Sequence, residues 1–126
     1  MIPSLWPNAP EISENKSSIT INPGINNIDY PTAQILLDSG KVVLLDVRER
    51  DEYNLGYIIG AINFPVDAIT KDSAQKIIPD KNIPIILYCL SGKRAYDAAL
   101  KLRSLGYNYL LNMGGISHWP YGTVRP

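Results

Sequence analysis

The chain has 126 residues, of which 45% are hydrophobic and 19% charged, and its twelve Lys and Arg residues balance its twelve Asp and Glu residues. This length suits one compact domain with a core, and the apolar runs are too short to span a bilayer. The balanced charge excludes an overall field that would hold nucleic acid or an anionic membrane surface, so we expect any anion to be bound locally.

The first 24 residues lack a helical or alternating apolar period and contain four prolines: Pro3, Pro7, Pro10 and Pro23. We predict an extended or loosely ordered arm, in which Trp6 and the run "ITI" at 19–21 are candidates to dock on the domain. The amino end has neither the basic region nor the apolar region of a secretory signal. This favours a cytoplasmic protein, with an exported form that has lost its signal as the open alternative.

From residue 29 the pattern becomes regular. "DYPTAQILLDSG" predicts a short helix, because Pro31 suits its first turn and Gly40 its end. "KVVLLDV" is apolar with little alternation, which is typical of a parallel strand covered on both faces. "RERDEYNLG" predicts another short helix, and "GAINFPV" another strand that Pro65 ends.

The second half repeats this alternation. "KDSAQKIIPDKN" predicts a helix or turn closed by Pro79, and "IPIILYC" is the most apolar predicted strand. The next helix has an apolar face of Ala95, Ala98, Ala99, Leu102 and Leu105. "YNYLLNM" predicts a last strand, followed by a turn at two glycines and a short helix with Trp119 in the core.

Repeated strand–helix order with buried strands predicts one α/β domain, with a parallel sheet and helices on both faces. Such a sheet places its ligand site outside the carboxyl ends of its strands. Cys89, the only cysteine, stands at one of these ends, directly after "IPIILY". It cannot form an intrachain disulfide, and with the single histidine, His118, it cannot form a usual structural zinc site.

The turn after Cys89 points to a reactive thiol. A lone cysteine at a strand end is most often a small buried hydrophobe. Here, however, "LSGKR" leads into a helix, and Gly92 permits a tight turn whose backbone N–H groups, from Leu90 to Arg94, can converge on the sulfur and on an anion above it. The helix amino end and the charges of Lys93 and Arg94 favour the thiolate, so we predict that Cys89 is a nucleophile.

Three ordered motifs give the chain a resemblance to the rhodanese-like (sulfurtransferase) single-domain family. "LLDVRERDEYNLGYIIGAINFP" resembles the family's Asp-Val-Arg…Glu-(Phe/Tyr)…Gly-His-Ile-Pro-Gly-Ala signature. "YCLSGKRA" resembles its Cys-x-x-Gly-x-Arg loop, and "NMGGISHW" its terminal Gly-Gly-(Ile/Phe)-x-x-Trp. The resemblance implies a three-layer α/β fold with a five-stranded parallel sheet over residues 25–126, and Cys89 as the catalytic residue.

Some positions depart from the family pattern. Tyr57 stands where the family usually has His, and Ile59 where it usually has Pro; we expect altered packing there and no lost chemistry. Leu90 stands where many active members carry a basic or polar residue, which removes a cation from the rim, and Lys93 compensates in part.

Asp46 and Arg48 match the family's Asp-Val-Arg. We interpret them first as an ion pair that fixes the loop at a strand end, with support of the pocket as the second interpretation. His118 has no acidic residue placed to orient it, so we interpret it as a helix-surface residue and not as a base.

The resemblance implies a two-step sulfur transfer. The Cys89 thiolate takes a sulfane sulfur from a small anion such as thiosulfate, or from a persulfide or polysulfide, and passes it to cyanide or a thiol, with a protein persulfide also possible as acceptor. The loop of Leu90, Ser91, Gly92, Lys93 and Arg94 binds the donor's oxyanion. No cofactor or metal is required, and we expect a monomer or weak dimer with no nucleic-acid or membrane partner.

Two alternatives remain open. One is a module that carries persulfide sulfur, or binds a partner, with little turnover. The other is a cysteine phosphatase or arsenate reductase; four residues separate Cys89 from Arg94, one fewer than in the loops that wrap a phosphate there.

Overall fold

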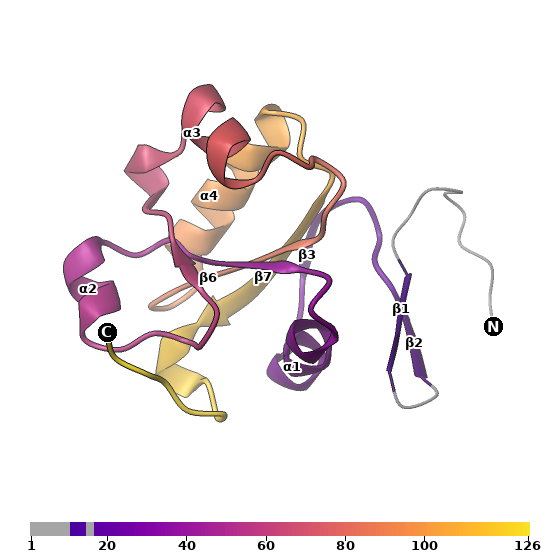
Figure 1. Cartoon of the computed structure of the whole chain (residues 1–126), viewed down its shortest axis with the longest axis horizontal. Helices are drawn as coiled ribbons and strands as arrows, with labels where there is room; N and C mark the ends of the chain where they lie inside the picture. Colours follow the sequence, from indigo (N-terminus) through magenta and orange to yellow (C-terminus); the bar gives the residue numbers. More distant parts are fainter. Residues whose placement is uncertain (1–10, 15–16) are drawn as a thin grey trace.

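The computed structural model describes residues 11–14 and 17–126, so Trp6 and the first three prolines lie outside the described residues. Figure 1 shows the arrangement of the elements. In chain order they are β1 (Glu11–Glu14), β2 (Ser17–Thr20), β3 (Gly24–Asn27), α1 (Tyr30–Ser39), β4 (Val43–Asp46), α2 (Arg50–Asn54), β5 (Ile62–Asn63), the 3₁₀ helix η1 (Val66–Ala68), α3 (Lys71–Ile77), β6 (Ile85–Cys89), α4 (Lys93–Ser104), β7 (Tyr109–Gly115) and the 3₁₀ helix η2 (Ile116–His118).

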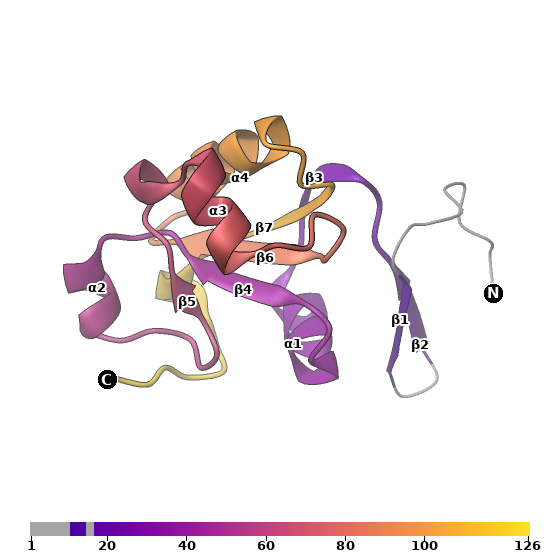
Figure 2. The same cartoon turned by 45° about the horizontal axis from the view of Figure 1, so that its top comes forward.

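Five strands form one parallel sheet in the order β3-β7-β6-β4-β5, which confirms the predicted α/β fold (Figure 2). Strand β6 is the central strand, and all five of its residues are buried. The edge strand β3 was not predicted, because "GINN" has one apolar residue and no alternation. It becomes a strand through its pairing with β7, an interaction that a local pattern cannot encode.

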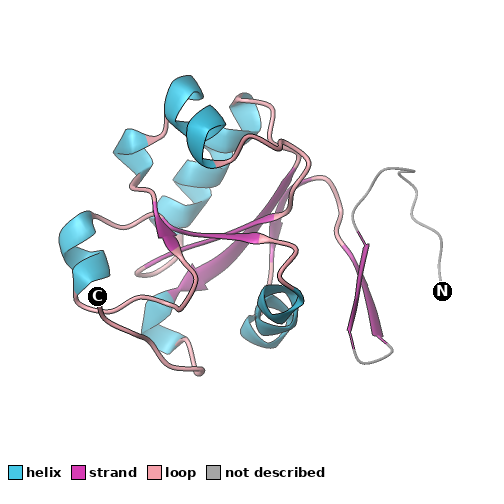
Figure 3. Cartoon of the chain, in the orientation of Figure 1, coloured by secondary structure: helices cyan, strands magenta, loops and turns pink. Residues whose placement is uncertain are grey.

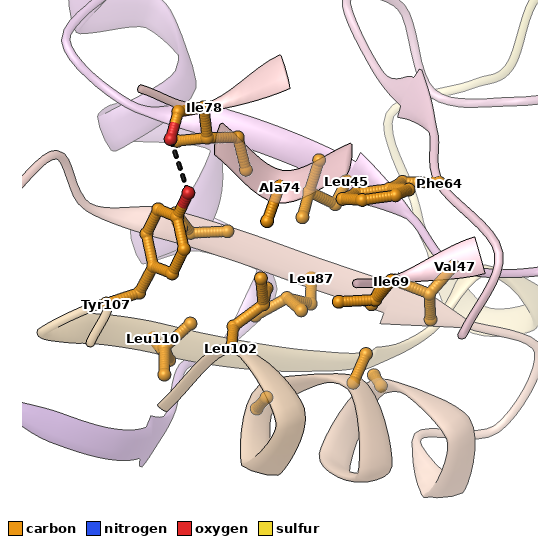
Figure 4. Close-up of a cluster of buried hydrophobic side chains, with 14 of the residues drawn as sticks. Leu45, Val47, Phe64, Ile69, Ala74, Ile78, Leu87, Leu102, Tyr107 and Leu110 are labelled. Carbon is orange, nitrogen blue, oxygen red and sulfur yellow. Dashed lines mark hydrogen bonds between the residues drawn. The ribbon is translucent and has the colours of Figure 1, made fainter. Parts of the chain in front are cut away.

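Helices cover both faces of the sheet: α3 and α4 lie on one face, and α1 lies on the other (Figure 3). Successive residues of β6 point alternately to the two sides, so Leu87 packs with α3 and α4 while Ile86 packs with α1. Figure 4 shows the cluster of buried apolar side chains on the α3 and α4 side of the sheet. In this cluster the Tyr107 hydroxyl donates a hydrogen bond to the Ile78 carbonyl oxygen. Cys89 belongs to this cluster, on the side of α4.

The helix boundaries follow local chemistry. The Asp29 side chain accepts a hydrogen bond from the Thr32 N–H at 2.9 Å and caps α1, and Gly40 ends this helix with a φ of +70°. The apolar face predicted for α4 is confirmed, since Ala95, Ala98 and Ala99 are fully buried.

The described part of the predicted arm contains an antiparallel hairpin of β1 and β2, beside α1 and apart from the sheet (Figure 1). Ile21, the last residue of "ITI", is 3% exposed and packs in the α1-side cluster with Ala33 and Leu36. This segment is therefore joined to the domain by a buried side chain. Among helices of the described part of the chain, none has the length and apolar character that crossing a membrane requires.

Candidate active site

Cys89 is the last residue of β6, and α4 starts four residues later at Lys93. Between them the chain makes the predicted tight turn, in which Gly92 adopts a φ of +109° that favours glycine. The Gly92 N–H donates a hydrogen bond to Cys89 Sγ with an N···S distance of 2.9 Å. The residue is only 1% exposed. Cys89 thus packs in the core, as a lone cysteine at a strand end most often does, and its sulfur also accepts a hydrogen bond from the loop.

Strand β7 and the 3₁₀ helix η2 that follows it hold this loop from the side. Gly115 pairs with Cys89 in the sheet, and a Cβ atom on Gly115 would lie 2.0 Å from the Leu90 carbonyl oxygen. The Asn112 amide donates to the Gly92 carbonyl oxygen at 3.2 Å, and the Ser117 hydroxyl donates to that of Leu90 at 3.2 Å.

These supporting contacts were not predicted. We expected the two glycines to form a turn after the strand, whereas both belong to β7. Pairing of the strands at the Cys89 end is what brings Gly115 against the loop. In the sequence, the pair of glycines directly after the apolar run "YNYLLNM" was the available signal that two backbones approach closely there.

Arg94 is paired with Glu52 of α2, which matches the Glu of the family's Glu-(Phe/Tyr) motif but was assigned no role from the sequence. The Arg94 guanidinium donates two hydrogen bonds to the carboxylate, at 2.6 and 2.9 Å. These bonds hold the pKa of Glu52 at about 2, and they raise the pKa of Arg94. Lys93 pairs with Asp97 at 3.1 Å on the exposed surface of α4.

Replacing Glu52 with Gln should lower stability in a pH-dependent manner. The pKa of Glu52 is about 2 in the folded protein and 4.5 without its partners, so its stabilising effect is complete above about pH 5 and disappears as the pH falls to about 2. Because the pair is about one-third exposed, we expect a difference of about 1 kcal/mol in the free energy of unfolding at pH 7. Denaturant unfolding of both proteins from pH 7 to pH 2 measures this difference.

Asp97→Asn is the matched control, because it removes the carboxylate that pairs with Lys93, whose side chain is 80% exposed. We expect this variant to differ from the native protein by at most about 0.5 kcal/mol in the free energy of unfolding at pH 7, because the pair is an exposed one. A Glu52→Gln difference that stayed constant down to pH 2 would contradict the assignment of the effect to the ionised pair.

Asp46 and Arg48 form the expected ion pair at the end of β4, with 2.6 Å between Arg48 Nη2 and Asp46 Oδ2. Both residues are buried, and Nη2 also donates to the Gly56 carbonyl oxygen at 2.7 Å. Burial disfavours the charged guanidinium, but the hydrogen bond and charge of Asp46 outweigh it and raise the pKa of Arg48. The pair therefore ties the β4 end to the segment after α2.

A pocket of about 360 Å³ opens at the carboxyl ends of the strands, where the sequence predicted the site. Arg48, Leu90 and Ile116 follow the ends of β4, β6 and β7, and each lines the pocket. The remaining lining residues are Glu52, Leu55, Gly56 and Thr123. Leu90 is the residue directly after Cys89, so the pocket adjoins the cysteine loop, and Arg48 is both a member of an ion pair and a wall of the pocket.

The other predicted residues lie around this centre. Ser91 is exposed on the loop, and His118 is exposed on η2, as expected. Trp119 packs in the core at 9% exposure. Tyr57, at the position of the family's His, stacks on Tyr53 with 4.1 Å between ring centroids.

The chain is thus a parallel α/β domain with one cysteine in a strand–loop–helix turn at the carboxyl edge of its sheet. It belongs to the rhodanese-like family, whose model, described as "Rhodanese-like domain", matches residues 31–120.

Curated relatives have related names. A "Sulfurtransferase" of Allochromatium vinosum is 36% identical over 97 residues, covering 75% of this chain and 88% of its own. A human "Thiosulfate:glutathione sulfurtransferase" is 32% identical over 105 residues, covering 73% of this chain and 90% of its own. Among solved structures, the rhodanese-like domain of an Anabaena protein is 28% identical, with a TM-score of 0.70 and 79% of each chain covered.

Proposed function

We propose that this protein is a sulfurtransferase that moves a sulfane sulfur from a donor to a thiol or cyanide through a persulfide on Cys89. The observation that carries the proposal is the hydrogen bond from the Gly92 N–H to Cys89 Sγ, at the amino end of a twelve-residue helix. A backbone donor and a helix amino end both stabilise negative charge on sulfur. The names of the relatives support the same class of reaction.

In the first step, the Cys89 thiolate attacks the outer sulfur of the donor. For thiosulfate, the new S–S bond to Cys89 forms as the bond between the two donor sulfurs breaks, and sulfite leaves with the electron pair. In the second step, cyanide attacks the outer sulfur of the persulfide, and thiocyanate leaves while the Cys89 thiolate is restored. Electrons and charge balance in both steps, so neither step needs an oxidant or a reductant.

The loop from Leu90 to Arg94 surrounds the sulfur in this proposal. Its N–H groups stabilise the charge of the persulfide, as an oxyanion hole stabilises a developing charge. The pocket between Arg48, Leu90 and Ile116 receives the donor. For Arg94 to bind the donor directly, its two bonds to Glu52 must rearrange.

The proposal is tested with the native protein in two assays. Incubation with thiosulfate should add the mass of one sulfur atom to the chain, and addition of cyanide should remove it and release thiocyanate in equal amount. Sulfur loading without continued thiocyanate formation would support the persulfide carrier instead. No loading by any sulfane donor, together with release of phosphate from an aryl phosphate, would support the phosphatase.

A further inference from the structure

Aliphatic side chains dominate the open part of the pocket. Leu55 is 73% exposed and Leu90 is 50% exposed, and Ile116 lines the same pocket from the end of β7. Single exposed leucines are ordinary, but three large aliphatic residues from different elements around one pocket mark a surface suited to an apolar group.

The cations near the loop are neutralised at the same time. The Arg94 guanidinium has both of its bonds on the Glu52 carboxylate, and the Arg48 guanidinium lies on the buried Asp46 carboxylate at 2.6 Å. Lys93, as described above, also has a carboxylate partner. A donor with two negative charges therefore meets no uncompensated cation among these three residues that would offset the loss of its hydration. A donor with one charge gives up less hydration free energy when it enters the pocket.

We propose that the preferred donor is a monoanionic sulfane-sulfur compound with an apolar group, an organic thiosulfonate or an organic persulfide, and that Leu90, Leu55 and Ile116 select it over thiosulfate. The inference rests on the proposed function and specifies its donor. For a thiosulfonate, the Cys89 thiolate forms the bond to the outer sulfur, the bond between that sulfur and the sulfonyl sulfur breaks, and an organic sulfinate leaves with the electron pair.

Benzenethiosulfonate and thiosulfate form a matched pair of probes, because a phenyl group in the first replaces a charged oxygen in the second. The measurement is kcat/KM for each donor at one ionic strength, with cyanide as acceptor and the uncatalysed rate subtracted. In Leu90→Lys, we expect the ratio of benzenethiosulfonate to thiosulfate kcat/KM to fall at least about tenfold. Loss of about 50 Å² of apolar contact alone accounts for a change of that size.

Leu100→Lys is the control, because Leu100 is 46% exposed on α4 and is not among the residues lining the pocket. This variant should leave the ratio unchanged. Glu52→Gln is an independent variant that removes the negative charge facing Arg94. It should raise kcat/KM for thiosulfate, which carries two charges, several-fold more than kcat/KM for benzenethiosulfonate, which carries one.

The outcomes separate the two proposals. Turnover of both donors with the same ratio in the native protein and in Leu90→Lys would overturn this inference and leave the sulfurtransferase standing. Failure of the native protein to accept sulfur from either donor would overturn both. Circular dichroism and thermal melting of each variant show that a changed ratio does not arise from unfolding.

Discussion

Cys89→Ser is expected to abolish sulfur transfer, lowering kcat by at least about a thousandfold. A serine hydroxyl is not ionised at neutral pH and cannot form the persulfide on which both steps depend. Since Cys89 is the only cysteine, no other residue can replace it as the sulfur carrier. Thiocyanate formation from the best donor found for the native protein measures the loss.

The variant should remain folded, because serine is close to cysteine in size and its oxygen can accept the Gly92 N–H. A hydroxyl in the apolar cluster with Leu87 and Ala95 should cost about 1–2 kcal/mol of unfolding free energy. Cys89→Ala, which removes the acceptor, should be equally inactive. Measurable turnover by either variant would contradict the proposed mechanism.

Gly115→Ala should reduce kcat/KM about a hundredfold and lower the free energy of unfolding by about 2–4 kcal/mol. The new Cβ would lie 2.0 Å from the Leu90 carbonyl oxygen and 2.9 Å from Ser91 Cα, and both of these are backbone atoms that no side-chain rotation can move away. The loop must therefore shift away from β7, which displaces the Gly92 N–H from the Cys89 sulfur.

Gly114→Ala separates this clash from an effect on the backbone. Gly114 has a φ of +93° and open space where its Cβ would be, so alanine there adds strain of about 1–2 kcal/mol without a clash. Gly115 is in an extended conformation, with a φ of −114°, so its substitution acts through space alone. Equal activity losses in the two variants would contradict the role of Gly115 in holding the loop.

The order of the elements and the place of the site were predictable from local patterns. Apolar runs without alternation identified β4 and β6, and Gly40 identified the end of α1. Cys89 stood at a strand end before a Gly-Lys-Arg turn, and the parallel sheet put that end at the site. These signals are local because hydrophobic period, helix capping and turn formation depend on residues close in the chain.

The neighbours of that turn were decided by the tertiary structure. Glu52 lies 42 positions before the Arg94 that it neutralises. Gly115 meets Leu90 only because β6 and β7 pair, and β3 becomes a strand only at the edge of β7. By itself, then, the sequence determined the α/β class, the position of Cys89 at the end of a strand and the tight turn that follows it. The charge balance, the apolar pocket and the close backbone approach required the folded chain, because each depends on side chains or strands that only long-range packing brings together.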